Sequence, residues 1–227
     1  MLGLKSLAIC NFSITNVCNA ACEFCGFARD KMPSGAARYV DADVSSRALQ
    51  ILHRRGIRYV TLQGGASRRR SPRFADRRGR YVMCLITNGW LLPRHITALA
   101  AAGLRQLIVS LDSATLVEHE HNRGLTGLEG RLSEGIARAR ALGRPVQASV
   151  TVNRLVDYDR LPDTLRRLGL DDLAFSYPRR EPLGSSSLVY GEDSRLVDLD
   201  RDELLDALEA IGRLRKQFPV LNPRPPR

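Results

Sequence analysis

The chain has 227 residues and a formal net charge of +11, and 44% of its residues are hydrophobic. This length suits one domain with a substantial core, and five cysteines, three of them clustered, do not suit a disulfide framework. No apolar run approaches the length of a membrane span and the N-terminus lacks a long secretory stretch, so we expect a cytoplasmic protein.

Strand-like and helix-like segments alternate along the chain. The predicted strands are short apolar runs, and the predicted helices repeat apolar residues every three or four positions. Asp43 is expected to cap the first helix, at 44–55. In chain order we expect a strand at 9–15, a helix at 44–55, strands at 58–63 and 81–87, a helix at 93–102, a strand at 104–111, a helix at 128–142, a strand at 146–152, a helix at 161–168, a strand at 173–177 and a helix at 201–218.

This alternation predicts the fold class. Six βα units imply parallel strands joined by right-handed crossovers, which suits an α/β fold with a partial, TIM-like (β/α)6 barrel. Barrels of this kind place their functional sites at the carboxyl ends of the strands. We expect residues 1–180 to form the barrel, and residues 181–227 to form a C-terminal loop and helix of the kind that a truncated extension leaves.

Three cysteines, Cys18, Cys22 and Cys25, lie in the run CNAACEFC directly after the first predicted strand. A structural zinc site takes four ligands, whereas an iron–sulfur cubane takes one thiolate per iron. Three thiolates therefore leave one iron open for a substrate or cofactor. A zinc knuckle completed by a remote histidine and three incidental core cysteines are the alternatives. Cys10 and Cys84 lie within predicted strands and are expected to be core residues.

The CxxxCxxC spacing resembles the signature of the radical S-adenosylmethionine (SAM) enzymes, and Phe24 matches the aromatic residue that usually precedes the last cysteine. The resemblance covers residues 8–178. It implies that Cys18, Cys22 and Cys25 hold a [4Fe–4S] cluster in a six-stranded partial barrel. In this family the open iron chelates SAM, and an electron from the cluster cleaves SAM to a 5′-deoxyadenosyl radical, which abstracts hydrogen from a substrate.

Gly64 and Gly65 end the second predicted strand, where the family usually has Gly-Gly-Glu-Pro and binds the amino group of SAM. Glycine lets the backbone approach a ligand closely. Here Ala66 replaces the glutamate, so the resemblance implies backbone contacts to SAM without the carboxylate. Asn88 and Gly89 match the family's Thr-Asn-Gly turn, for which a pocket role and a plain turn stay open.

Polar residues also end the fourth and fifth predicted strands. Ser110 and Asp112 stand in a Ser-Leu-Asp run that is frequent in the family, and the resemblance implies that the serine contacts SAM. Ser149, Thr151 and Asn153 share one face by strand alternation. That face is expected to point toward cofactor or substrate, and polar packing around buried water is the alternative.

Arg123 begins an Arg-Gly pair that related enzymes often carry at this place, where the arginine can pair with the SAM carboxylate. A solvated charged loop is the alternative. His119 and His121 are two positions apart, so they diverge on a helix and do not form a zinc pair. We expect both histidine side chains to be solvated.

Residues 68–80 read RRRSPRFADRRGR and carry a net +6 of the chain's +11. The segment replaces a helix between two strands, yet it has no apolar stripe with which to cover a barrel. It is either a basic loop that binds RNA phosphate or a segment translated from a locally shifted reading frame. We favour the shifted frame, because the family motif breaks off at Ala66, where the unusual composition begins.

These features predict a radical SAM enzyme that cleaves SAM reductively and takes hydrogen from an unknown small molecule or peptide. Its expected cofactors are a [4Fe–4S] cluster and SAM, and its electron donor a protein such as flavodoxin or ferredoxin. Nucleic acid and membrane partners are not expected. Two alternatives stay open: a cluster-binding but catalytically degenerate protein, and an RNA-modifying radical SAM enzyme.

Replacing Ala66→Glu should restore a carboxylate for the SAM amino group. A hydrogen bond to a charged group contributes roughly 1.5–3 kcal/mol, so we expect SAM affinity to rise about ten- to hundred-fold. The measurement is a titration of SAM against 5′-deoxyadenosine formation, with clusters reconstituted equally in both proteins. Equal affinities would show that the glutamate is dispensable in this chain.

Overall fold

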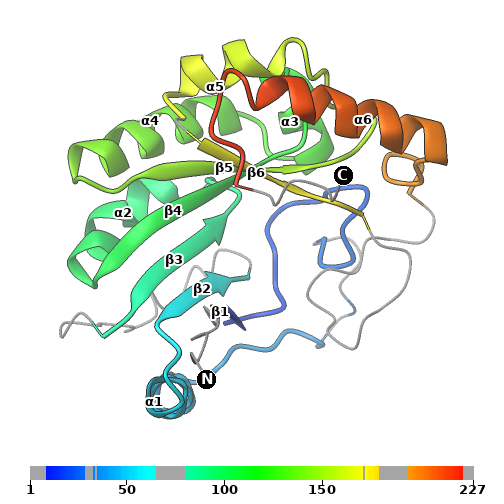
Figure 1. Ribbon diagram of the computed structural model, residues 1–227. Helices are drawn as coiled ribbons and strands as arrows, with labels where there is room; N and C mark the ends of the chain where they lie inside the picture. Colours follow the sequence, from blue (N-terminus) through cyan, green and yellow to red (C-terminus); the bar gives the residue numbers. More distant parts are fainter. Residues whose placement is uncertain are drawn as a thin grey trace, which may run out of the picture.

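The six predicted strands form one sheet. A computed structural model of the chain describes residues 9–28, 33, 35–64, 80–170, 172–178 and 194–221. The strands are parallel and lie in sequential order from β1 to β6 (Figure 1). The elements are β1 (Ile9–Ser13), α1 (Ala42–Arg54), β2 (Tyr59–Gln63), β3 (Val82–Thr87), α2 (Leu92–Ala101), β4 (Leu104–Leu111), α3 (Leu116–Arg123), α4 (Leu128–Ala141), β5 (Val146–Thr151), α5 (Leu161–Leu168), β6 (Asp172–Ser176) and α6 (Arg201–Leu214).

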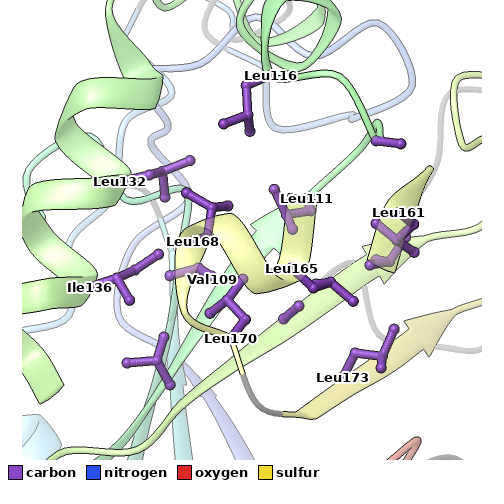
Figure 2. Packing of buried hydrophobic residues seen from close by; sticks show 14 of the residues in the cluster. Val109, Leu111, Leu116, Leu132, Ile136, Leu161, Leu165, Leu168, Leu170 and Leu173 are labelled. Carbon is purple, nitrogen blue, oxygen red and sulfur yellow. The ribbon is translucent and has the colours of Figure 1, made fainter. Parts of the chain in front are cut away.

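Apolar strand residues face the helices. Leu107, Val109 and Leu111 of β4 belong to a hydrophobic cluster that includes residues of α2, α4, α5 and α6, and Figure 2 shows part of this packing. A second, smaller cluster joins buried residues of β2 and β3 to α1. In Figure 1 the helices α2, α4, α5 and α6 lie together over one side of the sheet.

The other face of the sheet is mostly polar, and it lines the lumen of an open barrel. Paired residues of neighbouring strands share a face, and the pairs Ser13–Gln63, Ser110–Ser149 and Thr151–Ser176 run along it. Hydrogen bonds cross between strands on this face, from Gln63 Nε2 to Ser13 Oγ at 2.9 Å and from Gln106 Nε2 to Gln147 Oε1 at 3.3 Å. In the described part of the chain, β1 and β6 are the two edges of the sheet, so the barrel is not closed.

The predicted elements are confirmed within a few residues at their ends, with three differences. Helix α3 was not predicted, because its sequence LVEHEHNR is short and largely polar. Asp41, not Asp43, caps α1, since its Oδ1 accepts from the N–H of Asp43 at 2.7 Å and of Val44 at 3.4 Å. Helix α6 ends at Leu214, four residues before the predicted end.

The C-terminal helix packs on the barrel. Ala207, Ile211 and Leu214 of α6 belong to the same hydrophobic cluster as β4 and β5. Beyond α6, the N–H of Leu221 donates to the carbonyl of Leu173 at 2.9 Å, next to β6. Among the helices that the structure describes, none combines the length and the hydropathy that a bilayer span requires.

Candidate functional site

A cavity of about 410 Å³ lies at the carboxyl ends of β1 to β4, a size typical of small-molecule sites, which measure about 300–1,000 Å³. Its lining includes Ser13, Gln63, Thr87 and Ser110 from the four strands. The segment that follows β1, residues 16–28, forms another part of the wall and is called the cysteine loop below. The cavity thus lies where a parallel barrel places its functional site.

The three predicted ligands lie together in the cysteine loop. Cys18 and Cys25 line the cavity, and Cys22 is buried behind them with 6% of its surface exposed. All three are free thiols, as are Cys10 and Cys84, which contribute to the strands β1 and β3 as expected.

The donor set fits a cluster. Within the described residues, no group of three or more histidine, cysteine, aspartate or glutamate side chains stands close enough to hold a single metal ion. A cubane requires a different arrangement, because each thiolate binds its own iron. Three thiols on one short loop would therefore suit a cubane, each holding one iron, and two of them line the cavity.

Cys22 lies in an electrostatic field set by a buried ion pair. Burial raises the pKa of the Cys22 thiol to about 12, and the positive charge of Arg123 opposes this rise more strongly than the negative charge of Asp112 adds to it. The Asp112–Arg123 pair thus presents its cationic end to Cys22. A coordinating metal deprotonates a thiol outright, so this cationic end would favour the thiolate that iron requires.

Gly64, which directly follows β2, lies against Thr15, the residue just before the cysteine loop. Its φ is +130°, and a Cβ at this position would lie 2.7 Å from the carbonyl oxygen of Thr15. The described close approach of Gly64 is thus to protein backbone, and its approach to a ligand stays a prediction. Gly65, Ala66 and all but the last residue of the arginine-rich segment 68–80 lie outside the described residues.

The Asn88-Gly89 turn also contacts the cysteine loop. Asn88 lines the cavity, and its Nδ2 donates to Asn19 Oδ1 at 2.8 Å and lies 3.9 Å from Cys18 Sγ. Gly89 has a φ of +84°, and a Cβ there would lie 2.3 Å from Leu132. The turn therefore both packs against α4 and borders the cavity.

Asp112 and Arg123 form a buried ion pair beside the cavity, with side chains that are 1% and 8% exposed. Arg123 Nη2 donates to Asp112 Oδ1 at 2.7 Å. Burial alone would raise the pKa of Asp112, but Arg123 brings it below its usual value. Arg123 also lines the cavity, and its Nε has no hydrogen-bond partner among the described residues. Asp112 thus fixes one side of the guanidinium, while the buried Nε–H lacks an acceptor among the described residues.

The remaining predicted site residues divide into two groups. Ser110, like Gly64 and Arg123, lines the cavity, whereas Phe24, Asp112 and Asn153 are not part of its described lining. Phe24 is buried. Asn153 Nδ2 donates to the carbonyl oxygens of Asp112 at 2.9 Å and Thr151 at 2.7 Å, so its amide joins the ends of β4 and β5.

Two residues of α3 were missed by the sequence analysis. The prediction of a solvated His119 is wrong, because its side chain is 0% exposed and its Nδ1 accepts from the N–H of Asp112 at 3.1 Å. Burial lowers the pKa of His119 to about 3, with a further contribution from Arg123, so the imidazole is neutral. His121 is exposed, as predicted. Asn122 Nδ2 donates to Asp112 Oδ2 at 3.0 Å, a contact that no sequence motif signals.

Comparison with known proteins identifies a family. The family model of the radical SAM superfamily matches residues 12–168. A GTP 3′,8-cyclase of Stenotrophomonas maltophilia (strain R551-3) is 29% identical over 170 residues, which are 70% of this chain and 50% of that protein. An AdoMet-dependent heme synthase of Methanosarcina barkeri is 30% identical over 150 residues, 63% of this chain and 42% of that protein. The chain spans about half the length of the curated relatives it matches.

Solved structures share the fold at low sequence identity. SuiB of Streptococcus suis bound to S-adenosylmethionine superposes with a TM-score of 0.68 and 16% identity, over 95% of this chain and 50% of that one. anSMEcpe with bound AdoMet gives a TM-score of 0.64 and 12% identity, over 94% of this chain and 64% of that one. These neighbours are partial TIM barrels, and the predicted fold class is confirmed.

The buried pair should contribute far more to stability than an exposed one. We expect Arg123→Gln to lower the free energy of unfolding by about 3–5 kcal/mol, because it leaves the Asp112 carboxylate buried without its cation. Arg138→Gln is the matched control: it removes the partner of Glu134 from a pair whose side chains are 52% and 50% exposed, and should cost less than about 1 kcal/mol. Urea denaturation of the iron-free chains gives both values. Equal losses of unfolding free energy in the two variants would contradict the expectation that the buried pair contributes more than the exposed one.

Proposed function

This chain belongs to the radical SAM superfamily, and we propose that it binds a [4Fe–4S] cluster through Cys18, Cys22 and Cys25 and SAM in the adjoining cavity. The observation that carries the proposal is the lining of this cavity by two of the three thiols, at the carboxyl end of the barrel. When bound, the cluster and SAM supply reductive cleavage to a 5′-deoxyadenosyl radical, for hydrogen abstraction from a substrate. The protein is on this account a radical SAM enzyme.

The chain's own residues hold and orient the cofactors. We assign SAM contacts to Ser110, to the backbone at Gly64 and Gly65, and to Arg123. The unpartnered Nε of Arg123 supports its assignment to the SAM carboxylate, since a buried N–H without an acceptor is costly. Asp112 serves this role indirectly, because it holds the guanidinium in place.

Phe24 and Asn153 support the site without being part of the described lining of the cavity. Phe24 belongs to the cysteine loop and is buried, with 4% of its surface exposed. Asn153 fixes the end of β4 through the Asp112 carbonyl. Both roles orient the cofactor-binding residues without a contact to the reacting atoms.

The polar lumen favours a substrate that forms many hydrogen bonds. Ser149, Thr151 and Ser176 lie on the lumen face beyond Ser110, and each is partly exposed. A purely apolar substrate would leave these groups unpaired on binding. The substrate is therefore a polar small molecule or peptide.

The proposed reductive cleavage of SAM also implies an electron-donating partner. Reductive cleavage needs an electron donor, for which a flavodoxin or ferredoxin is suitable. Free clustered thiols suit a reducing, cytoplasmic location. We assign residues 1–180 to the radical SAM core and 181–227 to a C-terminal extension.

A catalytically degenerate protein is the second candidate, and Ala66 favours it. The glutamate that the family places here is absent, while the three cysteines are present. Such a protein would assemble the cluster without cleaving SAM. Cluster assembly and SAM cleavage must therefore be measured separately.

The chain purified without air and reconstituted with iron and sulfide should bind about four irons. Cys18→Ala, Cys22→Ala or Cys25→Ala should each remove most of this iron, because a cubane held by two thiolates is labile. Cys10→Ala and Cys84→Ala are the matched controls and should retain it. With SAM and a strong reductant, the intact chain should form 5′-deoxyadenosine. A colourless protein that binds one zinc ion through these cysteines would contradict the proposal.

A further inference from the structure

The last two residues of α3 hold the backbone on both sides of Cys22. The N–H of Ala21 donates to the carbonyl oxygen of Arg123 at 2.9 Å. The N–H of Glu23 donates to Asn122 Oδ1 at 3.3 Å. The two amide groups that flank the central cysteine are therefore both fixed by one helix end, far along the chain from the cysteine loop.

The side chains of the same two residues converge on Asp112. Asn122 Nδ2 donates to Asp112 Oδ2 at 3.0 Å, and Arg123 Nη2 donates to Asp112 Oδ1 at 2.7 Å. Asp112 is 0% exposed, and its own backbone is held by His119 and Asn153. A hydrogen bond to a buried carboxylate is shorter and stronger than one between neutral groups.

Asn122 thus joins the cysteine loop to the buried carboxylate through a single side-chain amide. Its oxygen accepts from the loop, and its nitrogen donates to Asp112. The orientation of the amide is fixed by these two contacts, because a flipped amide would place oxygen against the carboxylate. Arg123 holds the loop through its main chain, so a substitution at Asn122 can test the link without removing the buried ion pair.

We propose that Asn122 is a positioning residue that sets the place of the Cys22 sulfur relative to the iron it binds. The inference rests on the proposed cluster site. Residues that orient metal ligands from behind control the affinity for the metal and the electronic properties of the centre. Loss of the Asn122 amide should therefore loosen one thiolate corner of the cluster while the barrel keeps its fold.

The test compares Asn122→Leu and Asn122→Ala with the control His121→Leu, which changes the exposed neighbour on the same helix. Each protein is reconstituted anaerobically with iron and sulfide, and the first-order rate of iron release to a ferrous chelator is measured. We expect both Asn122 variants to release iron about tenfold faster than the intact chain, which corresponds to about 1.4 kcal/mol. The electron paramagnetic resonance spectrum of the reduced cluster should also change, and His121→Leu should match the intact chain in both measurements.

Unfolding of the iron-free chains separates positioning from simple stability. If Asn122 only stabilised the fold, its variants would unfold at lower urea while the spectrum and the release rate stayed unchanged, and the proposal would be overturned. Asn122→Ala decides the question if the larger leucine prevents folding. An intact chain that takes up no iron would instead overturn the cluster site, and the positioning role with it.

Discussion

The candidate site depends on the contacts that the buried carboxylate of Asp112 makes. Asp112 directly follows β4, the fourth of six strands in the barrel, and its carboxylate accepts from both the Arg123 guanidinium and the Asn122 amide. Desolvation of a charge is expensive, so this carboxylate requires its cation. The requirement fixes α3 against the strand end, and α3 in turn holds the loop that carries the cysteines. A helix of eight residues with little apolar surface is thereby tied firmly to the barrel.

The two faces of the sheet have different roles: one packs against the helices, and the other lines the lumen of the barrel. The face toward the helices is apolar and supplies the hydrophobic clusters that hold the barrel together. The lumen face carries hydroxyl and amide side chains that pair across strands, as Gln106 does with Gln147. Packing energy from one face thus stabilises a polar surface on the other. In the described residues, β1 and β6 are the two edge strands of the sheet, and residues 219–221 pair with β6.

Sequence patterns predicted most of the fold and the centre of the site. Short apolar runs located the strands, and the spacing of Cys18, Cys22 and Cys25 predicted a cluster loop, two of whose cysteines line the cavity. Helix α3 was missed because its stability depends on buried polar contacts, which leave no periodic apolar signal. His119 was expected in solvent for the same reason. Asn122 could not be found, since its role comes from two partners, Glu23 and Asp112, that lie far from it in the sequence.

The proposed cofactor site requires that three thiolates leave one iron of the cluster open to SAM beside this cavity. Mössbauer spectroscopy of the chain reconstituted with ⁵⁷Fe, recorded with and without SAM, tests it most directly. We expect SAM to change the signal of a single iron site and to leave the others as they were, because only the open iron can gain new ligands. A spectrum that SAM does not alter at any concentration, in a chain that carries an intact cluster, would contradict the account.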